Sequence, residues 1–248
     1  MEAGAAVDAG ERTSSSTSST EVQPQHIQPS FFPRLLKLEI ANCRSLKSMP
    51  PCPNVEKLEL VGVNKELRVL TAVVMPREGA SRLKTMRIDD IDRLISLPTD
   101  CLRGLTSLEI KKIDDPKLLD LSSLAEVFRS LSSLESLQIH DCNGLRSLHG
   151  GLEHLSSLKK MRISWCEQLD LSAEDKEIGM PWKALKGLQS LELRSLPKVK
   201  TLPEGIRFLT SLKRLDIVGC SGLRERCRGP NGDDWPKIRH IPVVKVWD

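Results

Sequence analysis

Aromatic residues are scarce in this sequence of 248 residues, which has no tyrosine, four phenylalanines and four tryptophans. Long apolar runs are missing as well, because the longest mainly apolar stretch, Val69 to Met75, is far too short to cross a bilayer. The first residues also lack a basic patch followed by an apolar run, which is the pattern of a secretory signal. We therefore expect a chain without a membrane span.

Strong charge of either sign is absent too. The formal net charge is +4, made up of −3 in residues 1–30 and +7 in the remainder. Proteins that bind nucleic acids usually combine basic clusters with aromatic side chains that stack on the bases. Since aromatic residues are so few here, we expect no nucleic-acid partner.

Closely spaced metal ligands are not found either. The seven cysteines form no Cys-x-x-Cys pair, and the five histidines form no pair four residues apart. Structural zinc sites need such spacings, so we expect no metal. None of the five asparagines begins an Asn-x-Ser/Thr glycosylation acceptor, which together with the cysteine pattern favours the cytoplasm, or the nucleus, as the location.

The sequence also lacks the motifs of catalysis and of nucleotide binding. It contains no Gly-x-Ser-x-Gly and no Gly-Lys dipeptide, which a GxxxxGK[ST] phosphate-binding loop requires. We therefore predict a protein that is not an enzyme and that holds no cofactor.

Leucine is abundant instead, with 38 residues, all of them after residue 30. A six-residue pattern with apolar residues at its first, fourth and sixth positions recurs eight times. The mean spacing of the copies is about 25 residues, which is in the range of leucine-rich repeats. The central residues of the eight copies are Leu38, Leu58, Met86, Leu108, Leu137, Met161, Leu191 and Leu215.

Each copy predicts one short strand, because alternate side chains of a strand point to the same face. Such a strand cannot bury its apolar face alone, but parallel stacking of successive repeats gives a continuous core. We predict an α/β fold for residues 31–248: a curved leucine-rich-repeat solenoid with a parallel sheet on its concave face and loops and short helices on its convex face. Residues 121–134 have the spacing of one such helix. Residues 1–30, rich in Ser, Thr, Gln and Pro, are expected to be disordered.

Four cysteines share one position just past the predicted strands. They are Cys43, Cys142, Cys166 and Cys220. A free cysteine behaves as a small apolar side chain, so we expect these four to pack inward.

Two segments carry a resemblance to a known family. The repeat Leu137-x-Ile139-x-x-Cys142-x-x-Leu145-x-x-Leu148 resembles those of plant intracellular nucleotide-binding, leucine-rich-repeat disease-resistance receptors. The tail, from Leu223 to Cys227 and from Gly232 to Pro242, is similar to the closing segment of their coiled-coil type. The resemblance implies a non-enzymatic protein-recognition domain without its own nucleotide-binding switch. It implies as partner a pathogen effector, a monitored host protein, or the nucleotide-binding module of the same receptor type.

A second class of leucine-rich protein stays open, the substrate adaptor of a ubiquitin ligase. Such an adaptor needs an F-box-like helical segment ahead of the repeats, and residues 1–30 do not supply one.

The end of the solenoid needs a cover, because the last repeat otherwise exposes its apolar face. We expect residues 224–248 to form this cap through Trp235, Ile238 and Ile241, with Val243 and Val244 adding cover. Pro242 is expected to limit further strand pairing there.

The binding surface is expected on the concave face, where the residues between the inward-pointing ones form a strip of mixed charge. Trp165 follows Ile163 by two positions, beside His140 and Arg194 of neighbouring repeats, and exposed Trp and Arg are typical interface anchors. A Trp165 packed in the loop that follows the strand is an equal alternative. The candidate partner-binding residues are Arg87, Asp89, Glu109, Lys111, Gln138, His140, Arg162, Trp165, Glu192, Arg194 and Asp216.

Overall fold

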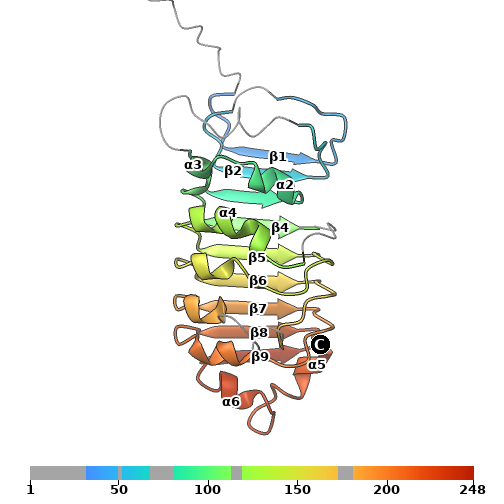
Figure 1. The fold of residues 1–248 in the computed structure, drawn as a ribbon, viewed down its shortest axis with the longest axis vertical. Coiled ribbons are helices and arrows are strands. Elements are labelled where there is room, and N and C mark those ends of the chain that lie inside the picture. The colour runs from blue at the N-terminus through green and yellow to red at the C-terminus, as the bar shows by residue number, and fades with distance from the viewer. Residues whose placement is uncertain (1–31, 50–51, 68–80, 113–118, 173–180) are drawn as a thin grey trace, which may run out of the picture.

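The computed structural model describes residues 32–49, 52–67, 81–112, 119–172 and 181–248, so the disorder expected for residues 1–30 lies outside the described part. One parallel sheet runs through the described ranges, with its strands in chain order along the long axis of the molecule (Figure 1). The prediction of a leucine-rich-repeat solenoid is confirmed. The strands are β1 (Lys37–Ala41), β2 (Lys57–Val61), β3 (Thr85–Ile88), β4 (Ser107–Lys111), β5 (Ser136–His140), β6 (Lys160–Ser164), β7 (Ser190–Arg194), β8 (Arg214–Val218) and β9 (Val243–Trp247).

The strands pair without any shift in register, so equivalent residues of successive repeats lie side by side. Leu137 of β5 pairs with Met161 of β6, which in turn pairs with Leu191 of β7. From β2 to β8 the second and fourth residues of every strand are buried. Because the inward residues form unbroken columns, each leucine is covered by the repeats on both sides, which stabilises the fold by roughly 1.5–3 kcal/mol per side chain.

The residue after most of these strands has a left-handed backbone, with φ between 50° and 64°. Except at Gly62, its N–H donates a hydrogen bond to the last carbonyl of the next strand, as Asp141 does to Ser164 and Trp165 does to Arg194. This turn ends each strand and starts the chain toward the other side of the solenoid. The residues in this position are Asn42, Gly62, Lys112, Asp141, Trp165, Ser195 and Gly219.

Short helices connect the strands, and neighbouring ones along α3, α4, η2, η4, η5 and α6 contact each other as a second column. The helix expected within residues 121–134 is present in shorter form, as η1 followed by α4. None of the helices in the described ranges is long and apolar enough to span a bilayer. The helices are α2 (Ile91–Ile95), α3 (Thr99–Leu102), η1 (Ser122–Leu124), α4 (Ala125–Ser130), η2 (Leu152–His154), η4 (Pro181–Ala184), η5 (Glu204–Phe208), α5 (Ser221–Arg224) and α6 (Trp235–Ile238).

Two large aromatic side chains fill the space between the sheet and this helix column. Phe128 and Trp182 are fully buried. A Cβ atom at Gly205 would lie 2.8 Å from Cδ1 of Trp182, so only glycine lets η5 approach the indole this closely. These two aromatic side chains are thus placed where leucine alone would leave a gap.

The cysteine position behaves as expected in three repeats and differently in the first. Cys142, Cys166 and Cys220 are buried, whereas Cys43 is exposed. The expectation was wrong for Cys43 because no described repeat covers the outer side of β1.

The sequence led us to expect that strand pairing ends at β8, but the sheet continues with a ninth strand. Strand β9 begins directly after Pro242 and pairs in parallel with β8 along its whole length. Pro242 removes only its own N–H, while the N–H of Val243 still donates to the carbonyl of Lys213. The ninth strand was missed because its Val-Val-Lys-Val-Trp sequence lacks the leucine pattern of the repeats.

Candidate functional site

The strip of mixed charge predicted for the concave face is present, and it is ordered by the register of the strands. The third residue of each strand points away from the core, so these residues form a row across the sheet. From β1 to β9 the row is Glu39, Glu59, Arg87, Glu109, Gln138, Arg162, Glu192, Asp216 and Lys245.

In the N-terminal part of the row one cation lies between two carboxylates. Nη1 of Arg87 lies 2.7 Å from Oε1 of Glu59, and its Nε lies 2.7 Å from Oε2 of Glu109. The hydrogen bonds from Arg87 to Glu59 and then to Glu109 raise the pKa of the guanidinium. Three strands therefore hold one another's charges in place, because Arg87 on β3 contacts both β2 and β4.

In the C-terminal part of the row this arrangement is inverted, with one carboxylate between two cations. Nη2 of Arg162 lies 2.7 Å from Oε2 of Glu192, and Nη2 of Arg194 lies 2.9 Å from Oε1. Glu192 is largely covered by the two arginines, whose own side chains are about half exposed. Both carboxylate oxygens are thus occupied, and the exposed charge of this cluster is positive.

Asp216 lies on this face as predicted, but it is only 8% exposed and does not present its charge to solvent. Its Oδ2 accepts a hydrogen bond from Nε of Arg214, which raises the pKa of that guanidinium, and its Oδ1 is buried without a partner. The expectation of an accessible carboxylate was wrong because β9, which the sequence analysis did not include, pairs Lys245 beside Asp216.

Asp89 also has a role in the fold. Its Oδ2 accepts a hydrogen bond of 2.6 Å from the N–H of Gly62, which has the left-handed turn conformation. At equivalent turns this N–H donates to a strand carbonyl, so the Asp89 carboxylate replaces that carbonyl where the chain turns into α2.

The middle of the face carries little charge. Gln138 is half-buried between Glu109 and Arg162 in the central row. Nδ1 of His140 and Oγ of Ser164 are 2.9 Å apart, and burial, followed by the charge of Lys111, lowers the pKa of His140. Ser164 is itself buried, so this pair holds β5 and β6 together and does not present a nucleophile.

Two tryptophans are exposed at the carboxyl edge of the face. Trp165 is 51% exposed and follows β6, and Trp247 is 50% exposed and ends β9. Nζ of Lys245 lies 5.0 Å from the centroid of the Trp247 ring, within the range of a cation–π contact. Trp165 was predicted at this surface beside Arg194, and Trp247 was missed together with its strand.

The C-terminal segment is organised around a buried carboxylate that the sequence analysis also missed. Asp234 has no exposed side-chain surface and accepts hydrogen bonds from the N–H of Leu202 at 2.9 Å and from Nε of Arg226 at 3.2 Å. Its other oxygen lies 3.1 Å from Nζ of Lys237. Burial alone would raise the pKa of Asp234, but the hydrogen bonds from Leu202, Arg226 and Lys237 together lower it.

The three residues expected to cap the solenoid follow Asp234 in the sequence and pack against the core. Ile238 and Ile241 are buried and Trp235 is half-buried against the core. A Cβ atom at Gly229 would lie 2.7 Å from the Trp235 ring, so the loop closes on the indole only with glycine there.

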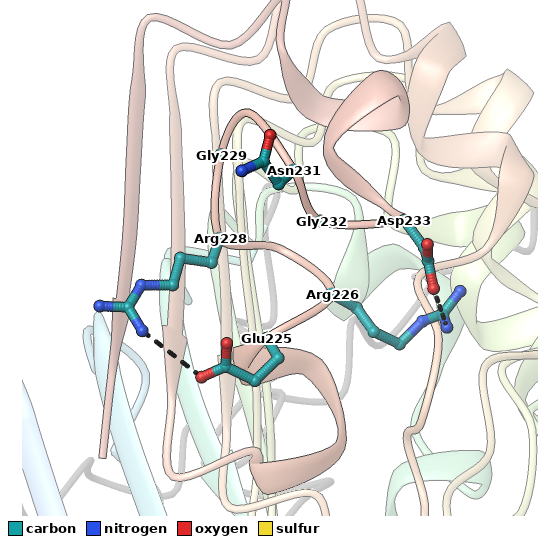
Figure 2. A pocket seen from close by; sticks show the side chains of 7 residues that line it. All are labelled: Glu225, Arg226, Arg228, Gly229, Asn231, Gly232 and Asp233. Atoms are coloured by element: carbon teal, nitrogen blue, oxygen red, sulfur yellow. Dashed lines mark hydrogen bonds and ion pairs between the residues drawn. The ribbon is translucent and has the colours of Figure 1, made fainter.

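A hollow of about 480 Å³ lies in the loop between α5 and α6 (Figure 2). Its charged side chains face one another in pairs, Arg226 with Asp233 at 2.8 Å and Arg228 with Glu225 at 3.6 Å. Since these charges compensate each other, nothing in the lining selects a ligand. Across the described ranges, no group of three His, Cys, Asp or Glu side chains could hold a metal ion.

A family model described as leucine-rich repeats of RPS2-like plant disease resistance proteins matches residues 121–226. The putative disease resistance protein RGA4 of Solanum bulbocastanum is 32% identical over 284 aligned residues, covering 90% of this chain and 27% of RGA4. Disease resistance protein RPP4 of Arabidopsis thaliana is 27% identical, covering 76% of this chain and 17% of RPP4. The chain therefore spans about a quarter or less of the length of these relatives.

Solved structures with similar repeats were also found. The structure of a TLR13–ssRNA13 complex aligns with 70% of this chain and 27% of that chain, at 16% identity and a TM-score of 0.48. The plant peptide hormone receptor RGFR1, in complex with RGF2, aligns with 88% of this chain and 34% of that chain, at 16% identity and a TM-score of 0.39. At these values neither similarity carries an inference about function.

Proposed function

Because the chain is a leucine-rich-repeat region of the plant disease resistance family, we propose that it is the protein-recognition domain of a plant immune receptor. It acts without chemistry of its own, in the cytoplasm or the nucleus. Its sequence contains no phosphate-binding loop, so the proposed role is recognition and not nucleotide exchange.

The observation that carries the proposal is the row of paired charges across the concave face. Arg87 is fixed by Glu59 and Glu109 from the two neighbouring strands, and Glu192 is fixed by Arg162 from the neighbouring strand β6 and by Arg194 from its own strand β7. Side chains that are already held in place lose less conformational freedom when a partner binds. A fixed pattern of charge on a rigid sheet is therefore suited to recognising a protein surface.

The proposed partner is a pathogen effector, a host protein that the receptor monitors, or a nucleotide-binding module of the same receptor type. The relatives are named as disease resistance proteins, and this favours a role in defence over that of a substrate adaptor of a ubiquitin ligase.

Position-specific photo-cross-linking in leaf tissue tests the proposal. A benzophenone amino acid at Gln138, in the centre of the concave face, should give discrete adducts with proteins. The same group at Arg129, on the exposed side of α4, serves as the matched control and should give none. Equal adducts from both positions, or none from Gln138, would contradict a recognition role for the concave face.

A further inference from the structure

The two ends of the concave face differ in charge. The outward residues of β1 to β4, together with Asp89 directly after β3, comprise four cations (Lys37, Lys57, Arg87 and Lys111) and four carboxylates (Glu39, Glu59, Asp89 and Glu109). On β6 to β9, five cations (Lys160, Arg162, Arg194, Arg214 and Lys245) accompany only two carboxylates, Glu192 and Asp216. We call the outward residues of β6 to β9, with Trp165, the basic concave face. Its excess charge is +3, and its two carboxylates are largely buried beneath arginines.

The same part of the face has both exposed tryptophans. Trp165 directly follows β6, and Trp247 is the last residue of β9. The two strands between them, β7 and β8, end with Arg194 and Val218. Neighbouring strands are about 4.8 Å apart, so the tryptophans are separated by roughly 14 Å along the solenoid. An extended peptide advances about 3.3 Å per residue, so this distance corresponds to about four residues.

Trp165 has an unfavourable backbone for its type. Its φ is 59°, in the left-handed region where equivalent turns have Asn, Asp or Gly in four cases and the smaller or flexible side chains of Ser195 and Lys112 in two. A bulky residue in this region costs about 1–2 kcal/mol, and half of its side chain remains exposed to solvent. Folding alone favours Asn or Gly here, so strain and exposure together point to a surface role for the indole.

We propose that the basic concave face binds an extended acidic peptide segment of a partner protein, with two large apolar side chains about four residues apart. This proposal rests on the proposed function and assigns it to one part of the sheet. The carboxylates of the segment contact the cations Lys160, Arg162, Arg194 and Lys245 of this face, and its apolar side chains contact the two tryptophans.

The chemistry favours an acidic peptide over a nucleic acid. A phosphate backbone has a negative charge at every nucleotide, whereas the excess charge of this face is only +3, because three of its five cations already pair with Glu192 and Asp216. Two rings roughly 14 Å apart also cannot stack on successive bases. An acidic peptide can place its charges beside the arginines and neutral residues elsewhere.

Selection of twelve-residue peptides from a random phage-displayed library, with the full chain as bait, tests this inference. Selected peptides should be acidic and contain two large apolar residues about four positions apart. In fluorescence anisotropy, Trp165→Ala with Trp247→Ala should weaken a selected peptide at least about thirtyfold. The charge variant Lys160→Glu with Lys245→Glu should weaken it at least about tenfold, because two attractions become repulsions.

Matched controls keep the result specific. Lys37→Glu with Lys57→Glu makes the same charge change on β1 and β2 and should alter the affinity less than about twofold. The substituted side chains are all exposed or partly exposed, and an unchanged thermal melting temperature identifies the variants that fold normally. Selected peptides without acidic bias, or with affinity unchanged in the Lys160→Glu/Lys245→Glu variant, would overturn the inference, as would displacement of the peptide by oligothymidylate at equal affinity.

The same variants separate this inference from the proposed function. If Gln138 cross-links to proteins equally well in the Lys160→Glu/Lys245→Glu variant, the acidic-peptide inference is wrong while concave-face recognition stands. If Gln138 gives no adduct in any background, the proposed function itself is wrong.

Discussion

The strands from β2 to β4 and those from β6 to β8 have the same backbone and opposite charge arrangements. In the first group Arg87 lies between two carboxylates, and in the second Glu192 lies between two arginines. The inward columns of leucine, isoleucine and methionine are equivalent in both. The comparison shows that the repeat determines where an outward side chain lies, while the charge of that side chain differs between repeats. Under the proposed function, this difference determines what is recognised.

The two groups also differ in how the sheet ends beside them. Next to β1, Leu36 is 55% exposed and Leu38 is only partly buried. Next to β8, the ninth strand and the segment around Asp234 cover the apolar columns. Both belong to residues 224–248, which we propose as the cap. The C-terminal half is therefore expected to be the more stable part of the solenoid.

The largest effect is expected from removing the buried carboxylate of this C-terminal segment. Asp234→Ala removes a fully buried carboxylate to which Lys237, Arg226 and the N–H of Leu202 all donate, and should lower the free energy of unfolding by about 3–5 kcal/mol. Asp233→Ala is the matched control, because Asp233 is 73% exposed and also pairs with Arg226, so its loss should cost about 0–1 kcal/mol. Urea denaturation measures both, and equal losses would show that the Asp234 contacts do not hold the cap.

Acid should weaken the C-terminal half through the same residue. The pKa of Asp234 is lower in the folded protein than its usual value, so its contribution is fully present above the unfolded pKa of about 3.9. This contribution is lost as the pH falls through the lower, folded pKa. Urea titrations between pH 6 and pH 3 should show a steeper loss of stability in the unmodified chain than in Asp234→Asn, and parallel curves would contradict the assignment.

A smaller difference is expected between equivalent leucines at the two ends. Leu191 of β7 is fully buried, so Leu191→Ala should cost about 3–4 kcal/mol, as buried leucine truncations do. Leu38→Ala removes a partly buried side chain of β1 and should cost about 1–2 kcal/mol. Thermal or urea unfolding of the two variants compares them, and an equal cost would show that β1 is as well covered as β7.

The charge clusters should contribute less to stability than the core does. Arg87→Gln leaves two carboxylates facing each other, and Glu192→Gln leaves two arginines unpaired, so each should cost about 1 kcal/mol or less. Salt should reduce both losses, because it screens the repulsion that remains. Urea unfolding at low and high salt measures these changes. A decrease of several kcal/mol in the free energy of unfolding would mean that the main role of the clusters is to stabilise the fold.

The smallest effect on stability is expected at Trp165. Trp165→Asn relieves the left-handed strain of about 1–2 kcal/mol and loses the packing of a half-buried ring, so the two effects nearly cancel. We expect a net change within about 1 kcal/mol together with a clear loss of peptide affinity. If stability falls strongly instead, the ring is retained for packing and not for binding.

The leucine pattern was sufficient to predict the sheet from β1 to β8, since a period of two identifies the inward side chains without knowledge of the partner strand. The same alternation placed Arg87, Arg162 and Glu192 on the outer face. It could not show which charges pair, because the partners of Glu192 and Arg87 lie up to 30 residues away across loops of unequal length.

The features that were missed depend on segments outside the repeat pattern. Strand β9 has valine where the repeats have leucine, so Trp247 and the burial of Asp216 beneath its neighbours were not foreseen. Asp234 looks like a surface residue in the sequence, because its partners Leu202 and Arg226 meet only when the C-terminal segment folds back on the last repeats.

Amide hydrogen exchange of the full chain, with and without a selected acidic peptide, tests most directly that recognition belongs to the C-terminal half of the concave face. We predict added protection in β6 to β9 and in the turn at Trp165, with no change in β1 to β4. Protection confined to β1 to β4, or spread over the convex helices, would contradict the account.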